Sequence, residues 1–209
     1  MTNEMAAAPK WDARYQADEY VFGTAPAQFM TAHATLFEPG QRALVVADGE
    51  GRNSVWLAQQ GLTVTAMDIS SIGADKARAL ASERGVAVDV EVADVLTWDW
   101  EPDAYDVVVA VFIQFLLAEQ RGPVFEGMVR TLRPGGRLLL HGYRPEQIAY
   151  ATGGPPLEEC MYTEELLTAE FQGLDIERLT SYDAELDEGA GHAGVSALID
   201  FVGRKPLGQ

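Results

Sequence analysis

Two glycines and two aspartates stand where a chain of alternating strands and helices can bind a ligand. Gly49 and Gly51 follow an apolar run and come just before a segment with helical character. A turn of this kind lets the backbone approach a ligand closely and leaves free N–H groups at the start of a helix. Asp68 and Asp94 end the next two apolar runs. We therefore interpret the glycine turn as a cofactor site with carboxylates beside it.

Asp68 has the spacing of an acid that binds a ribose. It lies 17 residues after Gly51, close to the ~20 residues found in dinucleotide sites. A carboxylate there can accept two directional hydroxyl hydrogen bonds. The alternative for Asp68 is an acid favoured at the positive end of a helix, and the alternative for Asp94 is an ordinary acid at a strand end. The glycine pair alone is weak evidence for a cofactor site, and the two acids strengthen that evidence.

The elements that must position these residues alternate along the chain. Apolar runs predict strands at 42–47, 62–67, 86–93, 105–112, 137–141, 174–186 and 195–203. Helical spacing and cap residues predict helices at 54–60, 71–84, 123–132 and 163–171. We predict an α/β fold with a doubly wound, mostly parallel sheet of seven strands, whose last two strands form an antiparallel hairpin at one edge.

The N-terminal part differs from the rest in composition. Residues 11–40 include Trp11, Tyr15, Tyr20 and Phe22, and we predict that this segment is a lid over the site. The alternative is that its aromatic side chains only fix the N-terminus to the body. We expect a single domain over 1–209, with a flexible tail at 1–10, the lid at 11–40 and the core at 41–205.

Composition narrows the choice of partners. The chain has 32 acidic and 15 basic residues, a net charge of -17, which repels phosphate backbones and anionic lipid surfaces. We therefore expect no nucleic acid and no membrane as partner. No apolar stretch reaches the ~18 residues of a membrane span, and the first ten residues lack a secretory pattern, so we predict a cytoplasmic protein. One cysteine and three dispersed histidines predict no disulfide and no metal site.

Three stretches resemble a known family. Residues 49–61 (GEGRNSVWLAQQG) are similar to the first motif of class I S-adenosylmethionine-dependent methyltransferases. Residues 11–15 and 20–26 resemble the N-terminal segment of the branch with tellurite-resistance and thiopurine methyltransferases, and 132–136 (LRPGG) resembles the turn before its fifth strand. The similarity runs from about 11 to 205. It implies a Rossmann-like fold, S-adenosylmethionine as cofactor and a small-molecule methyl acceptor.

The resemblance also implies roles for single residues. In chain order, the implied cofactor contacts are Tyr15, Tyr20, Ala47, Gly49, Gly51, Arg52, Asp68, Ile69, Asp94, Val95 and Ala110. The first turn would line the methionine part, Asp68 would hold the ribose, and Ile69, Asp94 and Val95 would meet the adenine. Ala110 would lie beneath the sulfonium. Arg52 would bind the cofactor carboxylate or form a structural ion pair.

The sequence departs from the family pattern at several positions. Val45 stands where the family often has an acid, and Ala47 stands where it often has glycine. On the acceptor side the candidates are Gln114, His141 and Tyr143, all at predicted strand ends. His141 is the titratable candidate, because the pKa of histidine lies near physiological pH; the alternative is a packing role. The other two histidines are interpreted as surface or packing residues.

Methyl transfer from a sulfonium needs little acid or base chemistry. Most of the acceleration can come from holding the nucleophile in line, and a base is needed only where the acceptor must lose a proton. The acceptor can be a soft sulfur, selenium or tellurium nucleophile, or a small organic oxygen or nitrogen group. The alternatives are a non-catalytic S-adenosylmethionine binder and an NAD-dependent oxidoreductase. The latter is disfavoured because Ser54 replaces the last glycine of its motif. We expect a monomer or homodimer.

Overall fold

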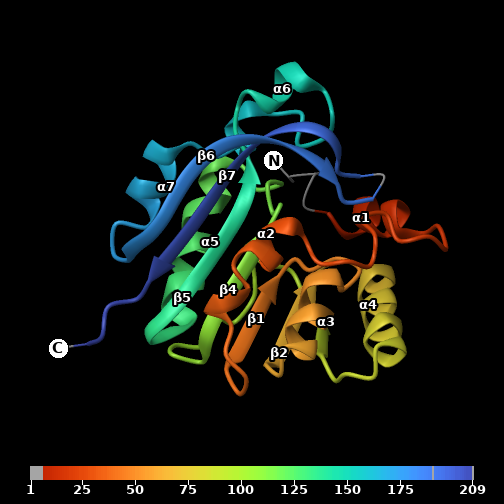
Figure 1. Ribbon diagram of the computed structural model, residues 1–209, viewed down its shortest axis with the longest axis horizontal. Coiled ribbons are helices and arrows are strands. Elements are labelled where there is room, and N and C mark those ends of the chain that lie inside the picture. The colour runs from red at the N-terminus through yellow and green to blue at the C-terminus, as the bar shows by residue number, and fades with distance from the viewer. Residues whose placement is uncertain (1–6, 190, 209) are drawn as a thin grey trace.

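One of the inner strands of the sheet is buried on both faces, as its continuous apolar sequence requires. Leu44 and Val46 of β1 (Arg42–Val46) pack on one face with α5 (Ala118–Thr131) and α7 (Glu164–Glu170). Ala43 and Val45 pack on the other face, with α2 (Gln28–Ala32) and α3 (Arg52–Gln59). The computed structural model describes residues 7–189 and 191–208. Its single sheet has one core layer on each face, and helices cover both faces (Figure 1).

The sheet has the predicted seven strands and the predicted edge hairpin. Besides β1, the strands are β2 (Thr63–Asp68), β3 (Asp89–Val92), β4 (Tyr105–Val111), β5 (Leu132–Tyr143), β6 (Asp175–Asp187) and β7 (Ala193–Arg204). Their order is β3-β2-β1-β4-β5-β7-β6. The first five are parallel, and β7 is antiparallel to both β5 and β6. The carboxyl ends of β1 to β5 thus meet at one edge, which is where such sheets bind ligands.

Helix caps follow the sequence closely. The helix α4 (Ser71–Glu83) begins after Ser70, whose hydroxyl accepts a hydrogen bond from the Gly73 N–H at 3.0 Å. The hydroxyl of Thr163 caps α7 by accepting from the Leu166 N–H at 3.1 Å. Such caps satisfy N–H groups that have no partner within the helix. The short α6 (Gln147–Tyr150) completes the α-helices between β5 and α7.

The starts of α5 and β5 are among the element boundaries that differ from the prediction. Helix α5 begins at Ala118, so Pro123 is its sixth residue and not part of its first turn. The side chain of Gln120 accepts a hydrogen bond from the Leu117 N–H at 3.2 Å, which fixes this earlier start. The predicted break at 133–136 is a bulge within β5, because Tyr105 pairs with Leu132 and Val107 then pairs with Arg137.

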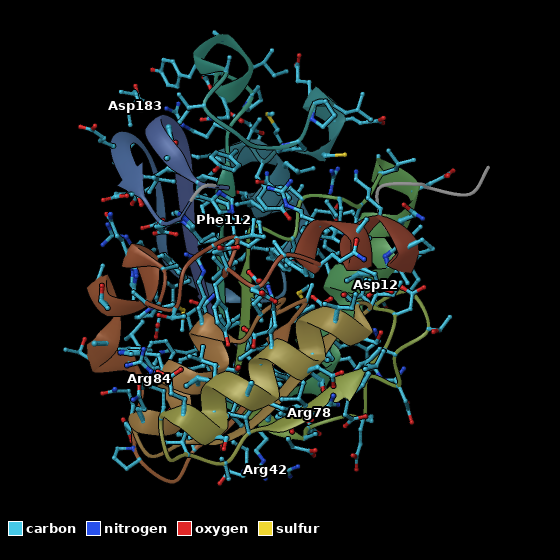
Figure 2. The ribbon with its side chains drawn as sticks, turned by 90° about the vertical axis from the view of Figure 1, so that its right-hand side faces the viewer. Asp12, Arg42, Arg78, Arg84, Phe112 and Asp183 are labelled. Atoms are coloured by element: carbon cyan, nitrogen blue, oxygen red, sulfur yellow. The ribbon has the colours of Figure 1, made fainter. Side chains whose placement is uncertain are left out.

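The N-terminal segment begins with a helix. Helix α1 (Ala8–Tyr15) includes residues 8–10, so the predicted flexible tail is wrong there, while residues 1–6 lie outside the described part. Asp12 ties α1 to the start of α4, since its Oδ1 accepts from Ser70 Oγ at 2.6 Å (Figure 2). None of the described helices is long and apolar enough to cross a membrane.

Two glycines of α5 give a matched test of this packing. A methyl group added at Gly127 would lie 2.5 Å from the Trp100 ring, whereas at Gly122 the nearest heavy atom is 4.0 Å away. Gly122→Ala should raise the free energy of unfolding by ~0.5–1 kcal/mol through helix propensity. Gly127→Ala should lower it by ~1–3 kcal/mol through overpacking. Urea denaturation measures both, and equal effects from the two substitutions would contradict the packing of Trp100 on α5.

Candidate functional site

A cavity opens at the carboxyl ends of β1, β2, β3 and β4. Its volume is about 730 Å³, counting the part that is open to solvent. We call it the first cavity. It is lined by Trp11, Tyr15, Phe22, Val45, Val46, Ala47, Asp48, Gly49, Arg52, Asn53, Asp68, Ile69, Ala93, Asp94, Val95, Val111, Phe112, Phe115 and His192. The loops after the first three strands therefore converge on one space.

Asp68 joins the ends of the first two strands. Its Oδ2 accepts from the Gly49 N–H at 2.8 Å, and its Oδ1 accepts from the Ser70 N–H at 2.8 Å. Burial raises the pKa of this carboxyl to about 6, against the lowering effect of those two N–H groups. Each carboxylate oxygen keeps a further lone pair, so Asp68 can still accept hydrogen bonds from a ligand.

Asp48 carries an oxygen without a partner. Its Oδ1 accepts from the Ser54 N–H at 3.4 Å, while its buried Oδ2 has no hydrogen bond within the described residues. Burial raises its pKa to about 6. The preceding Ala47 has φ 49°, in the left-handed region that favours glycine. A buried carboxylate oxygen with no donor is costly unless something else binds it.

The glycine turn leaves no room for a side chain. A methyl group at Gly49, where φ is 64°, would lie 2.7 Å from the Tyr15 hydroxyl. Tyr15 is buried and lines the same cavity. Across the cavity, Asp94 accepts from the Leu96 N–H at 2.9 Å through Oδ1, and Ile69 and Val95 supply apolar wall. The cavity thus has a polar end at the glycine turn and a more apolar end beyond β2.

The residues after the glycines hold the N-terminal segment in place. Glu50 accepts from the Val21 N–H at 2.8 Å and forms an ion pair with Lys76 at 2.9 Å. Arg52 pairs with Glu188 at 2.8 Å, which is the structural ion pair considered from the sequence. Asn53 accepts from the Ala27 N–H at 3.0 Å. One motif therefore both shapes the cavity and fixes the segment that covers it.

A second cavity adjoins the first. Its volume is about 680 Å³, again counting the part open to solvent. It is lined by Lys10, Trp11, Arg14, Phe22, Phe112, Gln114, Phe115, Tyr143, Gly154, Pro155, Pro156, Gly191 and His192. Five residues line both cavities, namely Trp11, Phe22, Phe112, Phe115 and His192. Figure 2 places Phe112 between α1 and the C-terminal strand pair, at this shared wall.

His192 is the titratable side chain of the shared wall, and the sequence analysis treated it as a surface or packing residue. Its ring stacks on Phe112 at 4.1 Å between centroids and lies 4.5 Å from Phe22. Its Nδ1 shares a 2.5 Å hydrogen bond with the Tyr143 hydroxyl. Burial and the nearby Arg52 lower the pKa of His192 to about 3. The ring is therefore neutral at physiological pH.

Three predicted cofactor contacts lie elsewhere. Gly51 faces α4, where an added methyl would lie 2.7 Å from Ala77, so this glycine serves helix packing. Ala110 points into the core, and its neighbours in β4 and the following turn line the cavity instead. Tyr20 lies on the outer side of α4, where its hydroxyl donates to the Lys76 carbonyl at 3.2 Å. The remaining eight predicted contacts line the first cavity.

The predicted acceptor-side residues divide in the same way. His141 lines neither cavity: it is buried behind Phe112, and its Nδ1 is 2.8 Å from Asp200. Gln114 lines the second cavity, but its amide is used by the backbone of Tyr143, donating to the carbonyl and accepting from the N–H. Tyr143 also lines that cavity. Of these three predicted residues, His141 alone lines neither cavity, whereas His192 lines both.

One part of the chain is similar to a known family. Residues 43–136 match the model of a family described as "Methyltransferase domain". This stretch, which is less than half of the chain, is similar to a methyltransferase domain. S-adenosylmethionine is the cofactor of such domains. An uncharacterized protein of Mycobacterium tuberculosis is 29% identical over 100 residues, and the demethylmenaquinone methyltransferase of Renibacterium salmoninarum is 31% identical over 131 residues.

Both alignments cover only part of this chain and part of the relative. The alignments cover 48% and 63% of this chain but 36% and 50% of the two relatives, so the chain spans about a third to a half of their length.

Among the described residues, no group of three or more histidines, cysteines and acids could hold a metal ion.

Solved structures share the fold over almost the whole chain. A protein solved in work on "Conversion of a Disulfide Bond into a Thioacetal Group during Echinomycin Biosynthesis" has a TM-score of 0.80 at 18% identity, covering 97% of this chain and 93% of that one. TehB from Haemophilus influenzae has a TM-score of 0.70 at 18% identity, and the match covers 95% of this chain and 66% of TehB. The [4+2]-cyclase SpnF scores 0.71 at 17% identity, covering 100% and 97%. These likenesses show the fold alone, and membership of the tellurite-resistance branch stays a prediction.

The first cavity fits S-adenosylmethionine. The orphaned oxygen of Asp48 suits a cationic group, and Gly49 lines the cavity with its backbone, without a side chain. Asp68 has lone pairs free for hydroxyl groups, and the apolar end at Ile69 and Val95 suits a heterocycle. Polar groups and apolar wall thus occur in the order that the cofactor requires.

Proposed function

We propose that the protein is an S-adenosylmethionine-dependent methyltransferase that acts on a small molecule. The observation that carries this proposal is the wall shared by the two cavities, because a methyl donor in one would lie beside an acceptor in the other. The second cavity is lined by residues of α1 and of the turn before β7, next to the aromatic side chains of the shared wall.

Residues of the first cavity would hold the cofactor. Asp68 would accept hydrogen bonds from the ribose hydroxyls, and the free oxygen of Asp48 would accept from the ammonium group. Ile69 and Val95 would pack on the adenine, with Asp94 at its polar edge. When bound, the cofactor supplies an electrophilic methyl group, whose bond to sulfur breaks with the electron pair left on sulfur as the acceptor atom bonds to the carbon.

The protein's own contribution to the reaction is positioning. Rigid aromatic side chains of the shared wall confine the acceptor, and confinement in a reactive geometry can supply ~7–11 kcal/mol at best. The low pKa of His192 makes it a weak general base at neutral pH. We infer that His192 and Tyr143 orient the acceptor atom by hydrogen bonding. We also infer that the enzyme favours acceptors that lose their proton to solvent, without a base from the protein.

Two alternatives are distinguishable from this proposal. A dinucleotide oxidoreductase has a parallel strand where this sheet has the antiparallel β7 between β5 and β6. A protein that binds the cofactor without transferring its methyl group is a real alternative, since the cyclase SpnF shows that this fold carries other activities. Product formation decides between transfer and binding alone.

The test is turnover of labelled S-adenosylmethionine with a panel of thiols, selenite, tellurite, phenols and amines. We expect labelled methyl product and S-adenosylhomocysteine with at least one acceptor. Asp68→Ala should lose more than 100-fold in kcat/KM while remaining folded by circular dichroism. His192→Phe, which keeps a ring in the aromatic stack, should stay within about tenfold of the wild type. Binding of the cofactor without product from any acceptor would favour the non-catalytic alternative.

The pH dependence of ligand binding tests the proposed role of Asp48. Binding an ammonium group favours the ionised carboxylate, so affinity should be full above pH 6, the pKa of Asp48 and Asp68 in the free protein. As the pH falls below 6, each of these groups must lose a proton on binding, and the affinity for S-adenosylhomocysteine should fall by up to ~tenfold per pH unit for each. Isothermal titration calorimetry at pH 5, 6 and 7.5 measures this.

A substitution separates the two carboxylates. Asp48→Asn should weaken binding at least tenfold at pH 7.5 and make the pH dependence shallower, because only Asp68 then titrates. Asp75→Asn, on the exposed face of α4, is the control and should change neither. Unchanged affinity in Asp48→Asn would show that Asp48 does not contact the ligand.

A further inference from the structure

The second cavity has walls of one chemical kind. Six of its lining residues carry rings, namely Trp11, Phe22, Phe112, Phe115, Tyr143 and His192, and Pro155 and Pro156 complete an apolar side. Phe22, His192 and Phe112 form a continuous stack, with successive centroids 4.5 and 4.1 Å apart. Ring faces and edges arranged in this way favour a planar, aromatic ligand, which gains from stacking as well as from burial.

The charges around this cavity have one sign. Lys10 and Arg14 are its charged lining residues among those described, and no acidic residue is found beside them in its wall. They are four residues apart on α1, so they lie on the same helix face. Neither forms an ion pair with any described residue, and the Arg14 guanidinium lies 5.2 Å from the centre of the Phe22 ring. Two cations therefore stand at an aromatic cavity without a carboxylate partner in the part of the chain that the structure describes.

This arrangement is unusual for a chain with 32 acidic and 15 basic residues. The overall field of the protein repels anions, so two unpaired cations together at a ligand cavity are a local reversal of that field. Most other basic side chains near the site already have partners: Arg52 pairs with Glu188, and Lys76 pairs with Glu50. The site thus offers a positive group to the ligand at its mouth and aromatic contact within.

We infer that the methyl acceptor is a small aromatic molecule that carries an anionic group, such as a carboxylate. The ring would lie among the aromatic side chains, with the anionic group toward Lys10 and Arg14 and the methylated atom toward His192 and Tyr143. This inference rests on the proposed function, because it takes the second cavity as the acceptor site. It adds the acceptor's chemical class, which no relative's name supplies for this chain.

Matched thiols test the inference. The acceptors are 4-mercaptobenzoate, its amide 4-mercaptobenzamide, and the aliphatic acid 3-mercaptopropionate, each with S-adenosylmethionine. We expect kcat/KM for the aromatic acid to exceed those for the amide and the aliphatic acid by at least tenfold. In parallel, calorimetry with S-adenosylhomocysteine present should show 4-methylbenzoate binding at least fivefold more tightly than 4-methylbenzamide, which gives a readout that needs no turnover.

Substitutions locate the charge. Arg14→Gln and Lys10→Gln should each reduce the preference for acid over amide by at least fivefold and leave binding of S-adenosylhomocysteine unchanged. Arg130→Gln, at an exposed position of α5, should keep the full preference. Equal binding of 4-methylbenzoate and 4-methylbenzamide, or an unchanged preference for acid over amide in Arg14→Gln, would contradict the inference that the acceptor carries an anionic group. Equal turnover of the aliphatic and aromatic acids would overturn the aromatic part.

The failure of this inference is distinct from failure of the proposed function. If S-adenosylhomocysteine binds and the amide is methylated as well as the acid, the methyltransferase proposal stands and the acceptor class is wrong. If S-adenosylhomocysteine gives no heat of binding at pH 7.5, the proposed function itself is wrong. If no thiol of the panel turns over, the ratio of 4-methylbenzoate to 4-methylbenzamide affinities still decides the acceptor class.

Discussion

The carboxylate of Asp68 holds the site together. Its two oxygens accept from the Gly49 and Ser70 N–H groups, each at 2.8 Å, and so fix the end of β1 against the end of β2. Ser70 in turn caps α4 and donates to Asp12 of α1. The glycine turn, the helix that follows β2 and the covering N-terminal helix are therefore positioned through one buried side chain, and the first cavity is the space that they enclose.

Backbone strain collects around the same space. Ala47 and Phe112, at the ends of β1 and β4, have φ values of 49° and 57°, although neither is glycine. Such conformations cost on the order of 1–3 kcal/mol each and persist only where the surroundings over-determine them. At Phe112 the surroundings are visible: its ring packs on His141, Tyr143 and His192. The strained turn places this ring in the wall that the two cavities share.

The sequence predicts the sheet and the loops of the site better than the direction of single side chains. Strand periodicity and the glycine turn are local signals, so Asp68, Asp94 and the edge hairpin follow from them. Ala110 fails because neighbouring residues of a strand face opposite sides, and a shift of one residue changes the assignment. His192 lies in a turn whose place depends on a distant contact, the Gly191 N–H donating to the Val21 carbonyl at 3.1 Å. No local pattern encodes that contact, whereas the titratable His141 at a predicted strand end is a local signal.

The central claim is that the first cavity holds S-adenosylmethionine and that its reacting end faces the second cavity. A crystal structure with S-adenosylhomocysteine tests this most directly. We expect the ribose on Asp68, the amino group on Asp48 and the sulfur at the wall formed by Phe112 and His192. Ligand bound outside this cavity, or bound with its sulfur turned away from that wall, would contradict it.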